Sequence, residues 1–394
     1  MTNSQEVVSR RKFAGGLAGL GAGLLLAGPR MALARVESSR RFVFVLQRGA
    51  ADGLHIVAPY ADPAYARLRG ALALDPAQAS RLDGTFALHP ALVETAAMYH
   101  QGQVLFAHAV ASPYRERSHF DGQNVLETGG SAPYQFRDGW MNRLTGALSG
   151  PSGGAKAIAI APTMPLVLRG AQKVESHAPS SLPEAGMDLL ARVEDLYGHD
   201  AQLRSLWSVA MEQREMAGPA ATGQPRQDAA TLGKLAAQFL SAPEGARIAV
   251  LETSGWDTHS AQLPRMTGPL RSLDTLLAAL RDGLGPVWDD TLVLVATEFG
   301  RTAAVNGTGG TDHGTGSVAW LLGGAVRGGR VMADWPGLAP ADLFQARDLR
   351  PTLDLDALIS AALGEHFRTD PVRLARRVFP RLSGTRLPSG LTRA

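Results

Sequence analysis

Short runs of apolar residues alternate with segments of helical periodicity along most of the chain. The apolar runs are rich in β-branched and aromatic residues, which predicts buried strands at 42–46, 104–110, 157–161, 248–252, 292–296 and 318–322. Between them, apolar positions at helical spacing predict helices near 91–99, 187–216, 228–240, 270–284 and 355–363. Strands that are apolar on both faces and separated by helices indicate an α/β fold: a doubly wound, mainly parallel sheet with helices on both faces.

We expect one such domain over residues 35–394, with a helical insertion at about 176–240. Residues 176–227 are mostly polar and helical in pattern, and they end in a Pro-, Gly- and Ala-rich stretch at 217–225 that is typical of a flexible loop. In a mainly parallel sheet the functional site lies at the carboxyl ends of the strands. Polar residues that follow the predicted strands are therefore the candidates for chemistry.

The amino terminus has the features of an export signal. The pair Arg10 and Arg11 precedes an uncharged run at 14–28, and small residues at 32–34 offer a cleavage site. The run is short and glycine-rich for a membrane span, which needs about 20 residues. An ordinary secretory signal would use the arginines only as positive charge, whereas the twin-arginine route reads the pair itself. We expect residues 1–34 to be a twin-arginine signal, the twin-arginine translocation machinery to be a partner, and the mature protein to be periplasmic without a permanent membrane span.

Composition limits both the partners and the metal chemistry. The 394-residue chain has 39 basic and 36 acidic residues, a formal net charge of +3. The predicted signal carries four of the basic residues and one of the acidic ones, which leaves 35 of each in the mature chain. No cluster of Lys and Arg is visible, so we expect no nucleic acid partner. The chain has no cysteine, so a metal ion must be held by oxygen and nitrogen.

Acidic side chains and histidines stand close to the ends of several predicted strands. Groups far apart in sequence can converge there, because the strand ends share one edge of the sheet. Carboxylates and imidazoles together bind divalent ions such as zinc, calcium, magnesium or manganese. Taken singly, each residue also has an ordinary interpretation, such as a turn cap for Asp52 or a buried ion pair for Glu298. The candidate metal ligands are Asp52, Asp257, His259, Glu298, Asp312 and His313.

Candidate catalytic groups follow the strand predicted at 104–110. Ser118 and His119 precede a predicted helix that ends near Gly129. By contrast, His108 lies inside an apolar run and is expected to pack or hydrogen-bond in the core. Three arginines near the predicted site either grip an anionic phosphate or sulfate or simply pair with acidic residues, and both interpretations stay open: Arg115, Arg117 and Arg301.

The segments around these residues form a set of motifs. They are RGAADGL at 48–54, SPYRERSHFD at 112–121, DGWMNR at 138–143, GWDTH at 255–259, TEFGRT at 297–302, GTDHG at 310–314, GGR at 328–330 and DWPG at 334–337. Together they resemble the secreted proteins of the domain-of-unknown-function 1501 family, from the first strand nearly to the carboxyl terminus. That family is similar to the alkaline phosphatase superfamily of phosphatases, sulfatases and phosphomutases. The resemblance implies an alkaline phosphatase-like doubly wound sheet and a two-metal centre.

The resemblance also implies roles for individual residues. One metal would be held by Asp257, His259 and His313, and the other by Asp52, Glu298 and the nucleophile. Phe299 stands where the superfamily has a metal-binding histidine, so the second site loses a ligand.

The position of the nucleophile is ambiguous. Counting back from Gly129 puts His119 where the superfamily has Ser, Thr or formylglycine, and Ser118 lies one residue earlier. Either Ser118 attacks after a metal lowers its pKa, or His119 is itself a ligand or nucleophile, or the fold persists without catalysis. These inferences favour a periplasmic, metal-dependent hydrolase of phosphate or sulfate esters. The alternative is a non-catalytic binding or assembly protein that recognises a cell-envelope glycan or a partner protein.

Replacing Arg10 and Arg11 by lysine should leave precursor in the cytoplasm. The twin-arginine receptor reads the guanidinium pair, and lysine keeps only the charge. Cell fractionation and immunoblotting of the double-lysine variant measure the effect. An unchanged periplasmic yield would exclude the twin-arginine route.

Overall fold

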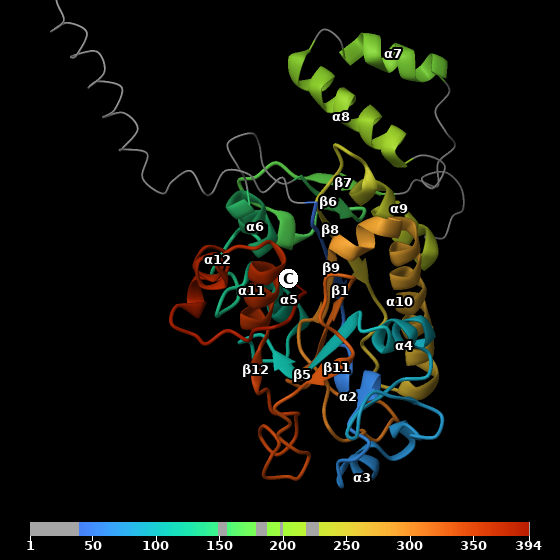
Figure 1. The fold of residues 1–394 in the computed structure, drawn as a ribbon, viewed down its shortest axis with the longest axis vertical. Helices are drawn as coiled ribbons and strands as arrows, with labels where there is room; N and C mark the ends of the chain where they lie inside the picture. Colours follow the sequence, from blue (N-terminus) through green and yellow to red (C-terminus); the bar gives the residue numbers. More distant parts are fainter. Residues whose placement is uncertain (1–38, 149–155, 179–186, 198–199, 218–227, 394) are drawn as a thin grey trace, which may run out of the picture.

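The computed structural model describes residues 39–148, 156–178, 187–197, 200–217 and 228–393, so the predicted export signal and most of the predicted loop at 217–225 lie outside the described residues. Its central sheet contains β1 (Arg41–Gln47), β5 (Val104–Ala111), β6 (Ala157–Ile160), β7 (Glu175–His177), β8 (Ile248–Thr253), β9 (Thr291–Thr297), β10 (Ser317–Leu322), β11 (Arg330–Met332) and β12 (Leu353–Asp354). The strand order is β11-β5-β10-β9-β1-β8-β6-β7, and β12 also pairs with β5 (Figure 1).

The sheet is mostly parallel, as predicted from its apolar strands. β1 pairs in parallel with β8 and β9, and β6 does so with β7 and β8. Only β10, among the strands of this sheet that the structure describes, runs against its neighbours β5 and β9. The predicted strands are all present. The edge strands β7, β11 and β12 were not predicted, because they are short and only partly buried and so lack an apolar run.

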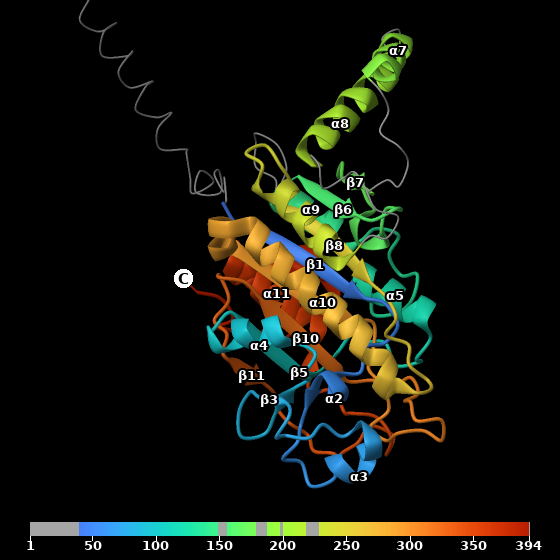
Figure 2. The same ribbon diagram turned by 90° about the vertical axis from the view of Figure 1, so that its right-hand side faces the viewer.

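Helices cover both faces of the sheet (Figure 2). Successive strand residues point to opposite faces, so Val43 and Val45 of β1 belong to one hydrophobic cluster and Phe42 and Phe44 to the other. The first cluster is covered by α4 (Val93–His100), α9 (Ala229–Ser241) and α10 (Gln262–Leu284). The second is covered by α5 (His119–Thr128), α6 (Trp140–Leu148), α11 (Leu355–His366) and α12 (Pro371–Val378).

The predicted helical insertion divides into two parts. Its pattern at 187–216 forms two helices, α7 (Met187–Tyr197) and α8 (Ala201–Ala217), which project from the end of the molecule in Figure 1. In contrast, α9 packs against α10 and places Leu235 and Phe239 in the core. The projecting part is therefore the α7–α8 pair, and α9 belongs to the helical layer over the sheet.

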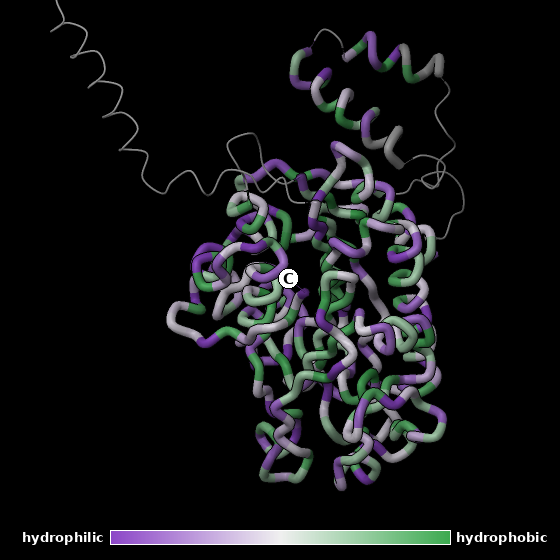
Figure 3. The backbone as a smooth tube through the Cα atoms, viewed as in Figure 1, coloured by the Kyte–Doolittle hydropathy of each residue, from purple (hydrophilic) through white to green (hydrophobic). Residues whose placement is uncertain are grey.

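A small substructure lies at the carboxyl end of β1. It contains α2 (Gly53–Ile56), α3 (Tyr65–Arg69) and a sheet of β2 (Val57–Ala58), β4 (Ala87–Leu88) and β3 (Ser80–Arg81). Hydrophobic segments concentrate in the central sheet and the helices that face it (Figure 3). None of the helices that the structure describes has both the length and the apolar character needed to cross a bilayer.

Trp140 should be one of the most important core residues for stability. Its ring is fully buried, with ring centroids 5.4 Å from Phe44 and 5.3 Å from Phe379, so it joins β1 to the end of α12. Trp140→Ala should lower the free energy of unfolding by about 3–5 kcal/mol, because it leaves a large cavity. Phe120, which is 83% exposed, offers an aromatic control. Phe120→Ala should change the free energy of unfolding by about 0.5 kcal/mol or less. Urea denaturation followed by circular dichroism measures both, and equal effects would contradict this packing role.

Candidate metal centre

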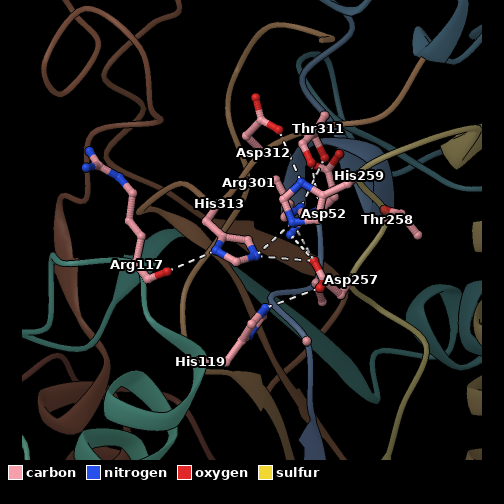
Figure 4. A network of polar contacts seen from close by, with 12 residues as sticks. Asp52, Arg117, His119, Asp257, Thr258, His259, Arg301, Thr311, Asp312 and His313 are labelled. Carbon is pink, nitrogen blue, oxygen red and sulfur yellow. Dashed lines mark hydrogen bonds and ion pairs between the residues drawn. The ribbon is translucent and has the colours of Figure 1, made fainter. Parts of the chain in front are cut away.

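Three loops meet at one edge of the central sheet. Asp257 and His259 follow β8, and His119 starts α5 after β5. His313 precedes β10, and because β10 runs antiparallel, its first residues lie at the same edge as the last residues of its neighbours. Figure 4 shows the three histidines turned toward Asp257. The structure thus brings together residues that are nearly 200 positions apart in sequence.

The ligand-type atoms of this histidine cluster, which we define as His119, Asp257, His259 and His313, are close to one another. The Nε2 atoms of His259 and His313 are 3.0 Å apart, and they lie 3.1 and 3.3 Å from Asp257 Oδ1. His119 Nε2 lies 3.5 Å from Asp257 Oδ2. Ligand atoms of His119, Asp257 and His313 all lie within 4.8 Å of one another, a spacing that a single metal ion can bridge.

Hydrogen bonds fix the orientation and the tautomer of each histidine in the cluster. Each Nδ1 contacts an oxygen that can only accept: His119 contacts Glu298 Oε1 at 2.8 Å, His259 contacts Asp312 Oδ1 at 3.1 Å, and His313 contacts the carbonyl of Arg117 at 2.9 Å. Nδ1 therefore carries the proton in each ring, and Nε2 presents a lone pair to the cluster. Metal-binding histidines commonly have such an oxygen partner on the second nitrogen.

The facing lone pairs need a positive charge between them. Two neutral imidazoles protonated at Nδ1 cannot hydrogen-bond through Nε2, so the 3.0 Å contact between His259 and His313 requires a metal ion or an extra proton. His119 Nε2 is also buried and has no hydrogen-bond partner among the described residues. A divalent ion satisfies all of these atoms at once, so the residues fit a metal centre with nitrogen and oxygen ligands.

Buried charges around the cluster set its electrostatics. Arg301 is fully buried and donates to Asp257 Oδ1 at 2.7 Å. Although burial opposes it, this contact lowers the pKa of Asp257 below its usual value, so the carboxylate stays ionised. The hydrogen bond to Glu298 raises the pKa of His119, whereas burial, reinforced by the nearby charge of His119, lowers the pKa of His313.

Two glycines of the loop at 309–317 allow the close backbone contacts that hold His313 in place. A Cβ at Gly310 would lie 2.3 Å from the carbonyl carbon of His259, and one at Gly314 would lie 2.3 Å from that of Arg301. Both distances are far shorter than any real contact, so only glycine fits. The glycine-rich character of this loop therefore has a direct structural cause.

The predicted ligands Asp52, Glu298 and Asp312 have other partners. Asp52 caps α2 and pairs with the buried Arg69, outside the histidine cluster. Glu298 is 1% exposed and contacts Nδ1 of His119, the ring nitrogen that is not turned toward Asp257. Asp312 contacts Nδ1 of His259 in the same way. The structure therefore places these three carboxylates around the cluster and pairs them with side chains or backbone amides.

The predicted catalytic groups are placed differently from one another. His119 belongs to the cluster, but Ser118 is the residue before α5, and its side chain makes no capping hydrogen bond. Of the predicted anion-binding arginines, Arg301 holds Asp257, Arg117 donates to Asp348 at 2.9 Å, and Arg115 donates to the carbonyl of Tyr114 at 2.7 Å. These arginines bind groups of the protein itself.

Sequence reasoning missed several residues that support the cluster. They are neutral or basic side chains from several elements: Arg69, Gln123, Gln262, Asn306 and Thr311. Thr311 lies inside the GTDHG motif and Asn306 lies shortly before it, whereas the other three have no such signal.

Comparison with known proteins agrees with the motifs. The family model described as "Protein of unknown function (DUF1501)" matches residues 39–379. The chain belongs to this family. No curated protein sequence matches this DUF1501 chain significantly.

Several solved structures are similar to this DUF1501 protein. One is a putative sulfatase from Bacteroides thetaiotaomicron, with TM-score 0.41 and 10% identity, covering 90% of this chain and 76% of that chain. Another is the C-terminal periplasmic domain of EcEptC from Escherichia coli in complex with zinc, with TM-score 0.38, 10% identity and coverage of 73% and 74%. A third is a protein in the alkaline phosphatase superfamily from Vibrio parahaemolyticus, with TM-score 0.37, 12% identity and coverage of 72% and 60%. At these scores the similarities do not assign an activity to the chain.

Alanine substitution should separate histidines of the cluster from histidines of the core. His259→Ala and His313→Ala should each lose bound metal with little loss of stability, because their side chains are partly exposed. His108 is fully buried and hydrogen-bonds the carbonyl of Val57 at 2.8 Å, so His108→Ala should destabilise the fold and keep the metal. Elemental analysis and thermal denaturation of the purified variants measure both effects. Equal metal content in the wild type and both cluster variants would contradict the site.

Proposed function

We propose that this protein is a metal-dependent hydrolase of phosphate or sulfate esters that acts in the periplasm after export by the twin-arginine route. The observation that carries the proposal is the convergence of three imidazole Nε2 atoms on one ionised carboxylate, with each Nδ1 committed to an oxygen acceptor. The family resemblance supports the class of substrate, and the signal-like amino terminus supports the location.

The residues that would hold the ion are His119, Asp257, His259 and His313. Among the divalent ions considered, zinc suits this set best, because imidazole nitrogens outnumber the oxygens. A bound ion would supply Lewis-acid chemistry toward an ester oxygen. The outer carboxylates Glu298 and Asp312 would keep the imidazoles oriented for it.

The three arginines that the sequence offers for an anionic ester have little free hydrogen-bonding capacity. Arg115, Arg117 and Arg301 are all engaged by carboxylates or carbonyls of the chain. Attraction of a phosphate or sulfate to this edge of the sheet would therefore depend on the bound cation. The hydrogen bond from His119 Nδ1 to Glu298 would make that ring a stronger ligand for the cation.

Ser118 and His119 have different proposed roles. His119 contacts Asp257 and Glu298, so it would serve as a metal ligand. Ser118 is adjacent, partly exposed and free of a capping bond, and it remains the proposed nucleophile.

A second candidate function is binding without catalysis, with a cell-envelope glycan or a partner protein as the ligand. One observation favours it. Phe299 stacks on His119 at a centroid distance of 5.2 Å, where the superfamily resemblance calls for a further metal-binding histidine. Elemental analysis and a panel of phosphate and sulfate esters would distinguish the two functions, since a binding protein would turn over none of them.

Comparison of Ser118→Ala with His119→Ala should identify the nucleophile. If Ser118 attacks the ester, Ser118→Ala should lower kcat by about 10³-fold or more while metal stays bound. His119→Ala should instead lower metal content as well as turnover. Single-turnover kinetics and elemental analysis on the same samples measure both. If neither substitution changes hydrolysis in folded, metal-loaded protein, the start of α5 is not part of an active site and the binding function becomes the better proposal.

A further inference from the structure

A second charged centre lies beside the histidine cluster and is built on Asp52 and Arg69. Both side chains are buried, with exposed fractions of 1% and 0%, and the Arg69 guanidinium donates to Asp52 Oδ2. Gln262 donates to the same oxygen at 2.6 Å. The backbone amides of Leu54 and His55 donate to Asp52 Oδ1 at 3.1 and 3.2 Å. Each oxygen of Asp52 therefore already has two donors.

Arg69 is held in this position from its other side. Its guanidinium also donates to the carbonyls of Thr302 and Ala303, at 3.3 and 3.5 Å. An arginine side chain keeps its charge at any relevant pH, and a buried charge that loses its partner is strongly unfavourable. A metal ion that took Asp52 as a ligand would leave this guanidinium buried without a counter-charge.

Glu298, the other carboxylate expected at a second metal, is occupied as well. Its Oε1 accepts from His119 at 2.8 Å, from the amide of Gly49 at 2.9 Å and from Gln123 at 3.1 Å. Its Oε2 lies 2.9 Å from the Thr297 hydroxyl oxygen, whose single proton also has the Gln47 carbonyl within reach at 2.8 Å. These contacts turn the carboxylate toward donors of the protein.

We propose that the chain binds a single divalent ion, in the histidine cluster, and that Arg69 stands in place of a second cation beside Asp52. The inference rests on the proposed metal-dependent function. The residues do not fit a second metal, because Asp52 and Glu298 are both committed to donors of the chain.

A buried hydrogen-bond chain ties this fixed charge to the cluster. The amide of Gln262 donates to Asp52, and its carbonyl oxygen accepts from the Thr311 hydroxyl at 2.7 Å. The Thr311 hydroxyl in turn accepts from Arg301 Nε at 3.2 Å, and Arg301 donates to Asp257. The Asp52–Arg69 pair is thus a positioning element for the cluster, one that touches no metal.

The experiment is a zinc titration of full-length mature protein stripped by a chelator, read by calorimetry and native mass spectrometry. The wild type should bind one zinc ion per chain. Asp52→Asn, which nearly preserves side-chain shape, should also bind one, with an affinity loss no larger than the roughly 10- to 100-fold typical of an outer-shell partner. His313→Ala is the matched control and should bind none. Circular dichroism checks that each variant is folded, and the wild-type stoichiometry alone tests the proposal if Asp52→Asn does not fold.

Each other outcome overturns a defined part of the inference. Two zinc ions in the wild type and one in Asp52→Asn would show a second metal at Asp52, which overturns this inference and leaves the proposed function intact. One ion that Asp52→Asn loses and His313→Ala keeps would overturn the location of the metal in the histidine cluster. No bound zinc in folded wild-type protein would overturn both the single-ion inference and the zinc centre on which the proposed function rests.

Discussion

The carboxylate of Asp257 is the contact on which the rest of the site depends. Its two oxygens meet His119, His259 and His313, and Arg301 holds it from the buried side. An ionised carboxylate that faces three imidazole lone pairs repels them unless a cation lies among these atoms. The positive charge of Arg301 keeps Asp257 ionised, and the cluster in turn needs a cation that a metal ion supplies best.

The antiparallel direction of β10 brings His313 to the same edge of the sheet as Asp257 and His259. Because β10 is antiparallel to β5 and β9, the loop that precedes it reaches the edge where β8 and β9 end. Gly310 and Gly314 let that loop press against the backbone next to His259 and Arg301. The sheet topology and the glycine contacts therefore act together to bring His313 to the cluster.

Two buried arginines neutralise two carboxylates at this edge of the sheet. Arg301 neutralises Asp257, and Arg69 neutralises Asp52. In each case another guanidinium nitrogen donates to a backbone carbonyl, and Arg301 also donates to the Thr311 hydroxyl, which holds the planar group in place. Both guanidinium groups are therefore engaged by the protein itself, and under the proposed function a bound ion would be the main attraction for an anionic ester.

The sequence by itself determined the class of fold and the neighbourhood of the site. Strands such as β1 and β9 must be apolar on both faces because helices cover the sheet on both sides, and that leaves continuous apolar runs in the sequence. Polar residues directly after such runs are then confined to one edge of the sheet. For this reason the sequence pattern placed Asp257, His259 and His313 among six candidate ligands at one edge of the sheet, and the family resemblance then grouped these three around one ion.

Only the tertiary structure decided which acidic residues face the histidines and which are paired elsewhere. Asp52 and Asp257 look alike in sequence, since both follow a strand and sit near a glycine. Asp52 lies beside Arg69 and Gln262, whereas Asp257 faces three imidazoles, and these partners come from elements far away along the chain. Local sequence patterns indicate which residues are buried and which lie in turns. The partner of a buried charge is set by long-range packing, which exists only in the folded chain.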